Sequence, residues 1–131
     1  MSPHISADHA SVRARLSARR TDTRGRIEAL ERDFDAIVEA NALVAVDDEH
    51  DPDGSSTAFE RAHVASLLEQ AREQLLGLDQ ALERLEQGDY GQCEVCGEAI
   101  PVERLEVRPA ARTCVRCATA RHRPRPGPRR R

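Results

Sequence analysis

The chain has 131 residues, of which 39% are apolar and 33% are charged, and its net charge is −3 at neutral pH. This is the length of one modest domain, or of a small module with an extended arm. Two Phe, one Tyr and no Trp exclude a globular interior anchored by aromatic side chains, whereas the small net charge argues against a chain expanded by self-repulsion. The longest apolar run has five residues, at 42–46, and the first thirty residues hold no apolar stretch of signal-peptide length. We therefore expect no membrane span and a cytoplasmic protein.

The charges are segregated along the chain. Residues 31–60 carry ten acids against one Arg, whereas residues 104–131 carry ten Arg against one acid. Such asymmetry generally steers partners rather than building a fold. Residues 122–131 are rich in Arg and Pro, which predicts a disordered basic tail. We also expect residues 1–8 to be unstructured.

Two stretches have the alternating three- and four-residue spacing of an apolar stripe on a helix that packs against another helix. The first stripe comprises Ile27, Leu30, Phe34, Ile37, Asn41 and Val44, and the second comprises Val64, Leu68, Ala71, Leu75, Leu78, Leu82 and Leu85. Towards residue 10 the first stripe continues only poorly, through Val12 and Leu16. Two such helices joined by a short turn are expected to fold back antiparallel and bury both stripes. An intermolecular coiled coil is the competing interpretation.

A helix-breaking, acidic segment separates the two stripes. Residues 47–56 hold five acids together with Pro52 and Gly54, which break helices through a missing N–H and through backbone entropy. Thr57, followed by Glu three residues later, has the spacing of a capping box and predicts the start of the second helix. We therefore predict a helical hairpin over residues 9–92 with an acidic tip at 47–56.

The four cysteines form two Cys-x-x-Cys pairs, Cys93 with Cys96 and Cys114 with Cys117, separated by seventeen residues. This is the spacing of a tetrathiolate zinc site, in which each pair supplies two corners of a tetrahedron. Two disulfides would need an oxidising compartment, and a redox-active dithiol would need a surrounding βαβ pattern that the sequence lacks. We therefore predict one structural zinc ion, held in a finger at residues 93–121, with no coordination position open for catalysis.

A dense sequence pattern surrounds these cysteines. It comprises residues 88–97 (GDYGQCEVCG), Ile100 and residues 104–117 (RLEVRPAARTCVRC). This pattern resembles the zinc finger of the DksA/TraR family, also at non-ligand positions such as Pro109. A long helical hairpin directly before the finger fits the DksA architecture, so the resemblance covers most of residues 20–118.

The resemblance implies a transcription regulator that binds RNA polymerase directly and has no sequence-specific DNA site. The lack of a long apolar run predicts no membrane partner. In the family the hairpin enters the secondary channel of the polymerase, acidic residues at its tip approach the catalytic centre, and several members act together with a nucleotide alarmone. The sequence shows no Ser/His/Asp set, phosphate loop or open metal site, which argues against an enzyme. The alternative is a small zinc-finger module that binds nucleic acid through its Arg-rich C-terminal end. The scarcity of aromatic side chains and the lack of a recognisable groove-reading helix argue against that alternative.

The tip departs from the Asp-x-x-Asp-x-Ala motif of the family. Asp48 and Asp51 have the Asp-x-x-Asp spacing, with Asp53 where the family has Ala, whereas counting back from the first Cys places His50 and Asp53 near the two Asp positions. We expect Asp48, Asp51 and Asp53 to act in partner binding through their charge. The helix that follows the finger in DksA is mostly replaced by the Arg- and Pro-rich tail, and no residue is assigned to the alarmone.

Overall fold

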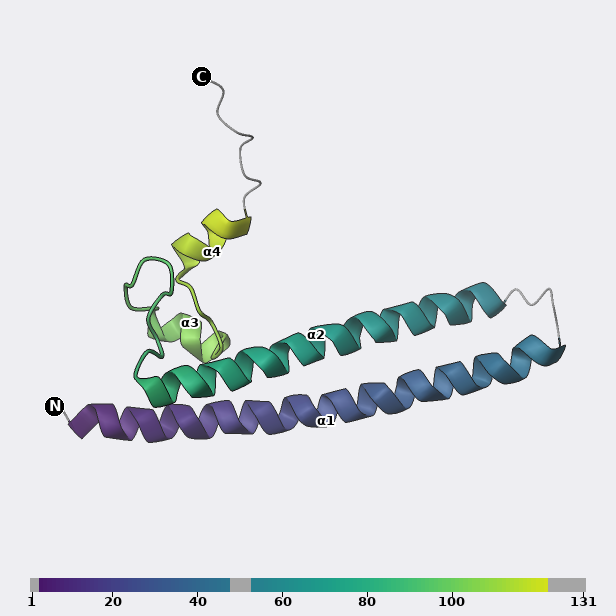
Figure 1. Ribbon diagram of the computed structural model, residues 1–131, viewed down its shortest axis with the longest axis horizontal. Coiled ribbons are helices and arrows are strands. Elements are labelled where there is room, and N and C mark those ends of the chain that lie inside the picture. Colours follow the sequence, from purple (N-terminus) through teal and green to yellow (C-terminus); the bar gives the residue numbers. More distant parts are fainter. Residues whose placement is uncertain (1–2, 48–52, 123–131) are drawn as a thin grey trace, which may run out of the picture. The chain divides into compact units, whose positions relative to one another are not determined.

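The computed structural model describes residues 3–47 and 53–122, which contain four helices (Figure 1). The helices are α1 (Pro3–Asp47), α2 (Asp53–Gln87), α3 (Val102–Val107) and α4 (Val115–His122). Between α2 and α3, an isolated antiparallel bridge pairs Gln92 with Ala99. The fold is therefore mainly helical, with two long helices followed by a small segment that contains the cysteines.

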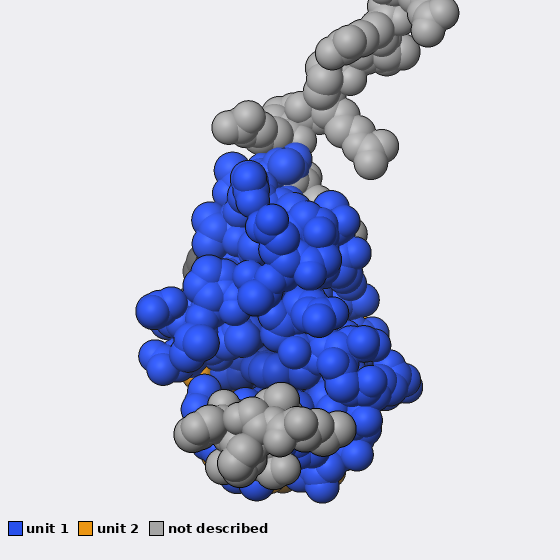
Figure 2. Space-filling view, turned by 90° about the vertical axis from the view of Figure 1, so that its left-hand side faces the viewer, with its two compact units in different colours: residues 1–16, 78–131 blue, residues 17–77 orange. Residues whose placement is uncertain are grey.

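The chain divides into two compact units, which Figure 2 distinguishes by colour. Unit 1 comprises residues 1–16 and 78–131, and unit 2 comprises residues 17–77. Both long helices contribute to each unit, because the boundaries fall within α1 and α2. In Figure 2 the residues of unit 1 form one continuous surface.

In unit 2, α1 and α2 run side by side and antiparallel. The core of this unit comprises the buried Ile27, Leu68 and Ala71 and the half-buried Leu30 and Leu75. On the solvent side, Glu31 of α1 and Arg72 of α2 form an ion pair with a distance of 3.2 Å between Oε2 and Nη2. All five core positions belong to the two predicted stripes, and the stripes pair within one chain. The predicted antiparallel helical hairpin is confirmed.

In unit 1, the remaining parts of α1 and α2 pack against each other and against the cysteine-containing segment. The core comprises the buried Leu16, Leu78, Ala81 and Leu85, with Val12, Leu82, Tyr90 and Ala110 packed against it. Leu16 is 0% exposed, although the stripe around it is poor in the sequence. Its burial arises because Tyr90 and Ala110 bring apolar atoms from outside the hairpin to the same core. Arg13 and Glu86 also form an ion pair between the two helices.

Both long helices begin earlier than the sequence predicts. α1 starts at Pro3, within residues 1–8 that were expected to be unstructured, and proline is well tolerated in the first turn of a helix because the N–H it lacks has no partner there. α2 starts at Asp53 instead of near Thr57. Gly54 therefore lies inside the first turn, where its cost of roughly 1 kcal/mol is small beside the packing of a 35-residue helix.

Two predicted segments fall largely outside the described residues. These are residues 48–52, at the centre of the acidic tip, and residues 123–131 of the basic tail. His122, which was expected to belong to the tail, is the last residue of α4. Within the described ranges, no helix combines the length and the hydropathy needed to cross a membrane.

Candidate metal centre

The first cysteine pair lies in a tight turn enclosed by the β-bridge between Gln92 and Ala99. The N–H of Cys93 donates to the carbonyl of Glu98 at 2.8 Å, and the N–H of Gly97 donates to the carbonyl of Cys93 at 2.9 Å. Gly97 has a φ of 77°, in the left-handed region where a residue without Cβ is favoured. The glycine after the second cysteine therefore allows the chain to close a knuckle around Cys93 and Cys96.

The second pair lies at the start of α4. Cys114 immediately precedes the helix and Cys117 lies in its first turn. The N–H of Ala118 donates to the carbonyl of Cys114 at 2.9 Å, so the helical turn itself sets the spacing of the two sulfurs. Both pairs are thus held by local backbone structure that their own sequence produces.

The four sulfur atoms meet at one point. The Sγ atoms of Cys93, Cys96, Cys114 and Cys117 all lie within 4.8 Å of one another, and those of Cys96 and Cys114 are 3.9 Å apart. All four cysteines are free, whereas a disulfide would require a separation of about 2 Å. A tetrahedron with Zn–S bonds of about 2.3 Å has edges of roughly 3.8 Å. The cluster fits one structural zinc ion, whose coordination sphere the four thiolates would fill.

Backbone amides in the knuckles favour the thiolate form of one cysteine in each pair. The N–H of Cys96 is the main cause that lowers the pKa of Cys93 to about 6. The N–H of Cys117 likewise lowers the pKa of Cys114, whereas a hydrogen bond with the Cys114 sulfur raises the pKa of Cys117 to about 12. Zinc is bound by thiolates, so each pair has one sulfur that is already suited to the metal.

The core around the metal centre is small and consists largely of the ligands. Cys93, Ile100 and Cys114 are buried, and Leu105 and Cys117 pack against them. The side chain of Arg104, in α3, donates from Nε to the carbonyl of Thr113 at 2.9 Å. Since Thr113 is the residue before Cys114, this contact fixes the backbone from which a ligand projects.

We expect Arg104→Gln to weaken zinc binding, because the shorter side chain no longer holds the Thr113 carbonyl. Groups that orient metal ligands typically contribute about 10–100-fold in affinity, and competition with a chromogenic chelator measures this change. Arg108→Gln is the matched control, since Arg108 is exposed and its side chain makes no hydrogen bond with the described residues. Equal zinc affinities for the two variants would contradict the positioning role of Arg104.

Three polar contacts join the finger to α2 and its C-terminal end. The hydroxyl of Tyr90 donates to the carbonyl of Pro109 at 2.7 Å, and Nη2 of Arg84 donates to the carbonyl of Ala111 at 3.1 Å. Nη1 of Arg112 donates to Oε1 of Gln80, also at 3.1 Å. Burial is the main cause that raises the pKa of Tyr90 and lowers that of Arg84. The finger is thereby fixed to the part of α2 that belongs to the same unit.

These contacts are absent from the sequence-based predictions. Tyr90 is the only Tyr in the chain, and its place three residues before Cys93 is the signal that could have indicated a structural role. The other side chains in these contacts are those of Gln80, Arg84 and Arg112, and nothing in their spacing distinguishes them. Arg112 and Arg116 pair with the carboxylates of Glu94 and Glu98 at 3.1 and 3.3 Å, which links the two knuckles.

The structure does not describe the side chains of the three predicted tip residues. Asp48 and Asp51 lie outside the described residues. Asp53 is the first residue of α2, and its side chain is outside the described part. The functional role of these three acids therefore remains a prediction from the sequence.

Comparisons with known proteins agree with this architecture. The family profile described as the prokaryotic dksA/traR C4-type zinc finger matches residues 88–123. The structure of transcription factor DksA2 from Pseudomonas aeruginosa superposes with a TM-score of 0.71 at 30% identity, covering 88% of this chain and 83% of that one. The RNA polymerase-binding transcription factor DksA of Caulobacter vibrioides is 41% identical over 70 residues, which are 53% of this chain and 49% of that protein. An uncharacterized protein of Bacillus subtilis, YteA, is 41% identical over 66 residues, or 50% of this chain and 28% of that protein.

An antiparallel helical hairpin followed by a four-cysteine zinc finger defines a class of small helical zinc proteins, and the match to DksA2 extends over both parts. The chain belongs to the DksA/TraR family. It spans about half the length, or less, of the curated relatives that it matches.

Proposed function

We propose that the chain is a transcription regulator that binds RNA polymerase directly and inserts its acidic-tipped hairpin into the secondary channel. The observation that carries this proposal is the likeness to DksA2, which extends over the hairpin as well as the finger and covers 83% of that transcription factor. Relatives matched in sequence are named RNA polymerase-binding transcription factors. The polymerase as partner implies a cytoplasmic protein.

The charge distribution supports a rod that carries negative charge to a basic partner. Residues 31–60, which lead into and out of the hairpin turn, hold ten acids and one Arg. Carboxylates gathered in this way repel one another, and a cavity lined by cations would stabilise them. We infer that Asp48, Asp51 and Asp53 act by this charge. A zinc ion with four thiolate ligands has no open position for a substrate, so the proposed role is regulatory and not catalytic.

The test of the tip is a variant in which Asp48, Asp51 and Asp53 are changed to Asn, which preserves size and turn chemistry and removes three negative charges. We expect near-parental binding to immobilised core RNA polymerase, because the finger and the helices supply most of the contact area. The effect on initiation in a purified transcription assay, with and without the nucleotide alarmone, should be lost. Thermal stability should be unchanged or slightly higher.

A charge-matched control removes three exposed acids from α1, by Asp22→Asn, Glu28→Gln and Asp33→Asn. This variant should still regulate transcription, since its acids lie away from the tip. A tip variant that regulates like the parent would refute the tip mechanism even if polymerase binding held. If the parent does not bind polymerase but binds DNA through residues 121–131, the nucleic-acid alternative is correct.

A further inference from the structure

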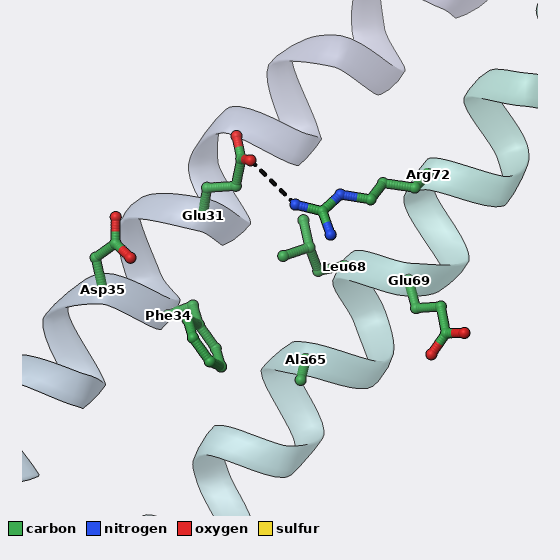
Figure 3. Close-up of a pocket in the computed structure, with 7 residues that line it drawn as sticks. All are labelled: Glu31, Phe34, Asp35, Ala65, Leu68, Glu69 and Arg72. Atoms are coloured by element: carbon green, nitrogen blue, oxygen red, sulfur yellow. Dashed lines mark hydrogen bonds and ion pairs between the residues drawn. The ribbon is translucent and has the colours of Figure 1, made fainter.

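A groove of about 760 Å³ lies between α1 and α2 in unit 2 (Figure 3). In Figure 3, Phe34 projects from α1 into the space between the helices, and the ion pair of Glu31 with Arg72 spans them on one side. The lining residues are Glu31, Phe34, Asp35, Ala65, Leu68, Glu69 and Arg72. An apolar floor is therefore bordered by three carboxylates and one guanidinium.

The lining has the chemistry of a receptor for arginine side chains. Phe34 is half-buried, so part of its ring is accessible to a cation, and a guanidinium stacks favourably on an aromatic face. Asp35 and Glu69, on opposite sides of the groove, form no ion pair with any residue in the described ranges. In Figure 3 the two carboxylates point outward from α1 and α2, away from the ring, so an Arg-rich segment lying across the groove would stack one guanidinium on Phe34 and pair others with Asp35 and Glu69.

The chain itself contains a segment of complementary charge. Residues 121–131 hold six Arg and no acid. Unit 2 carries 14 of the 23 acids and 7 of the 20 Arg, whereas unit 1, which includes this segment, carries the other 9 acids and 13 Arg. Each copy thus combines a strongly acidic unit with a basic one, and opposite charges of this kind attract separate molecules to one another.

We propose that the groove between α1 and α2 binds the Arg-rich C-terminal segment of a second copy of this chain. The contact is heterologous, because one copy contributes the groove and the other the segment, so it leaves a free groove and a free segment at the two ends of every dimer. The self-association is therefore open-ended, and screening by salt weakens it. The contact involves neither the zinc ion nor RNA polymerase, so its test is independent of the test of the proposed function.

Sedimentation velocity of the zinc-loaded full-length chain under reducing conditions tests this contact. We expect a weight-average sedimentation coefficient that rises with protein concentration in about 50 mM NaCl. In about 500 mM NaCl, where the Debye length falls from roughly 14 to 4 Å, the apparent dissociation constant should increase about tenfold or more. A parent chain that is monomeric at every concentration in low salt overturns the proposal. A sedimentation coefficient that is higher in low salt but independent of protein concentration also overturns the proposal, because the segment would then bind within its own chain.

Two complementary variants identify the partners in the contact. The groove variant carries Asp35→Asn and Glu69→Gln, and the tail variant carries Arg123→Gln, Arg125→Gln and Arg129→Gln. Each alone should associate about tenfold more weakly than the parent, because each lacks one side of the charge pairs. An equimolar mixture of the two retains one intact groove and one intact segment, and it should form a 1:1 dimer that grows no further.

The control for net charge is Asp22→Asn with Glu28→Gln, which removes two exposed acids of α1 outside the groove. This variant should associate like the parent. If the groove variant associates as strongly as the parent, or if the mixture forms no 1:1 dimer, the groove is not the binding site of the segment.

Discussion

Replacing Cys114 with Ser is expected to release the zinc ion and unfold the finger. The metal accounts for most of the stability of this part, because three of the five residues in its core are ligands and only Ile100 and Leu105 are not. Structural zinc supplies on the order of 10 kcal/mol to small fingers, far more than two aliphatic side chains provide. Elemental analysis should find less than one zinc per chain, and hydrogen exchange should show loss of protection over residues 88–122.

The same variant should leave unit 2 folded. Its core of Ile27, Leu68 and Ala71 contains no residue of the finger, so the amides of unit 2 should keep their protection. Protection in unit 1 should decrease beyond the finger, because Tyr90 and Ala110 pack on the core around Leu16.

Val115→Ser is the matched control for this experiment. It introduces the same side chain one residue further along, at a position that is 56% exposed, and it should keep a full equivalent of zinc. One zinc per chain and unchanged hydrogen exchange in Cys114→Ser would show that the four cysteines do not hold the metal together.

Leu16→Ala is expected to lower the free energy of unfolding by about 2–5 kcal/mol, the range for deleting a buried leucine side chain. Leu16 is 0% exposed and lies against Leu78, Ala81 and Leu85. The truncation leaves a cavity where α1, α2 and the finger region meet, and the surrounding helices can close it only in part. Denaturant titration followed by circular dichroism at 222 nm, on the zinc-loaded protein, measures the change.

Leu76→Ala provides the comparison, because Leu76 lies on α2 and is 58% exposed. Its unfolding free energy should stay within about 0.5 kcal/mol of the parent. If the two variants unfolded at the same denaturant concentration, Leu16 would not be a core residue of the folded protein.

Local spacing in the sequence determines the helices and the metal site. The stripe positions Ile27, Leu68 and Ala71 follow the helical period, and all three are buried. The cysteines of each pair are three positions apart, which is the span of a single turn, and the four Sγ atoms do meet within 4.8 Å. Periodicity and spacing were therefore sufficient to predict the two long helices and the cysteine cluster, although not the residues at which the helices begin.

Several other contacts between residues far apart in the chain were decided by the tertiary structure alone. Leu16 belongs to a poor stripe and is nevertheless fully buried, because Tyr90 and Ala110 reach the same core. The hydrogen bond from Tyr90 to the carbonyl of Pro109 has no counterpart in any periodic pattern. The groove that contains Phe34 exists only because a particular register places this ring opposite the small Ala65. Periodicity specifies which side of a helix is apolar, but the register of packing and the docking of a separate segment determine how deeply each residue on that side is buried.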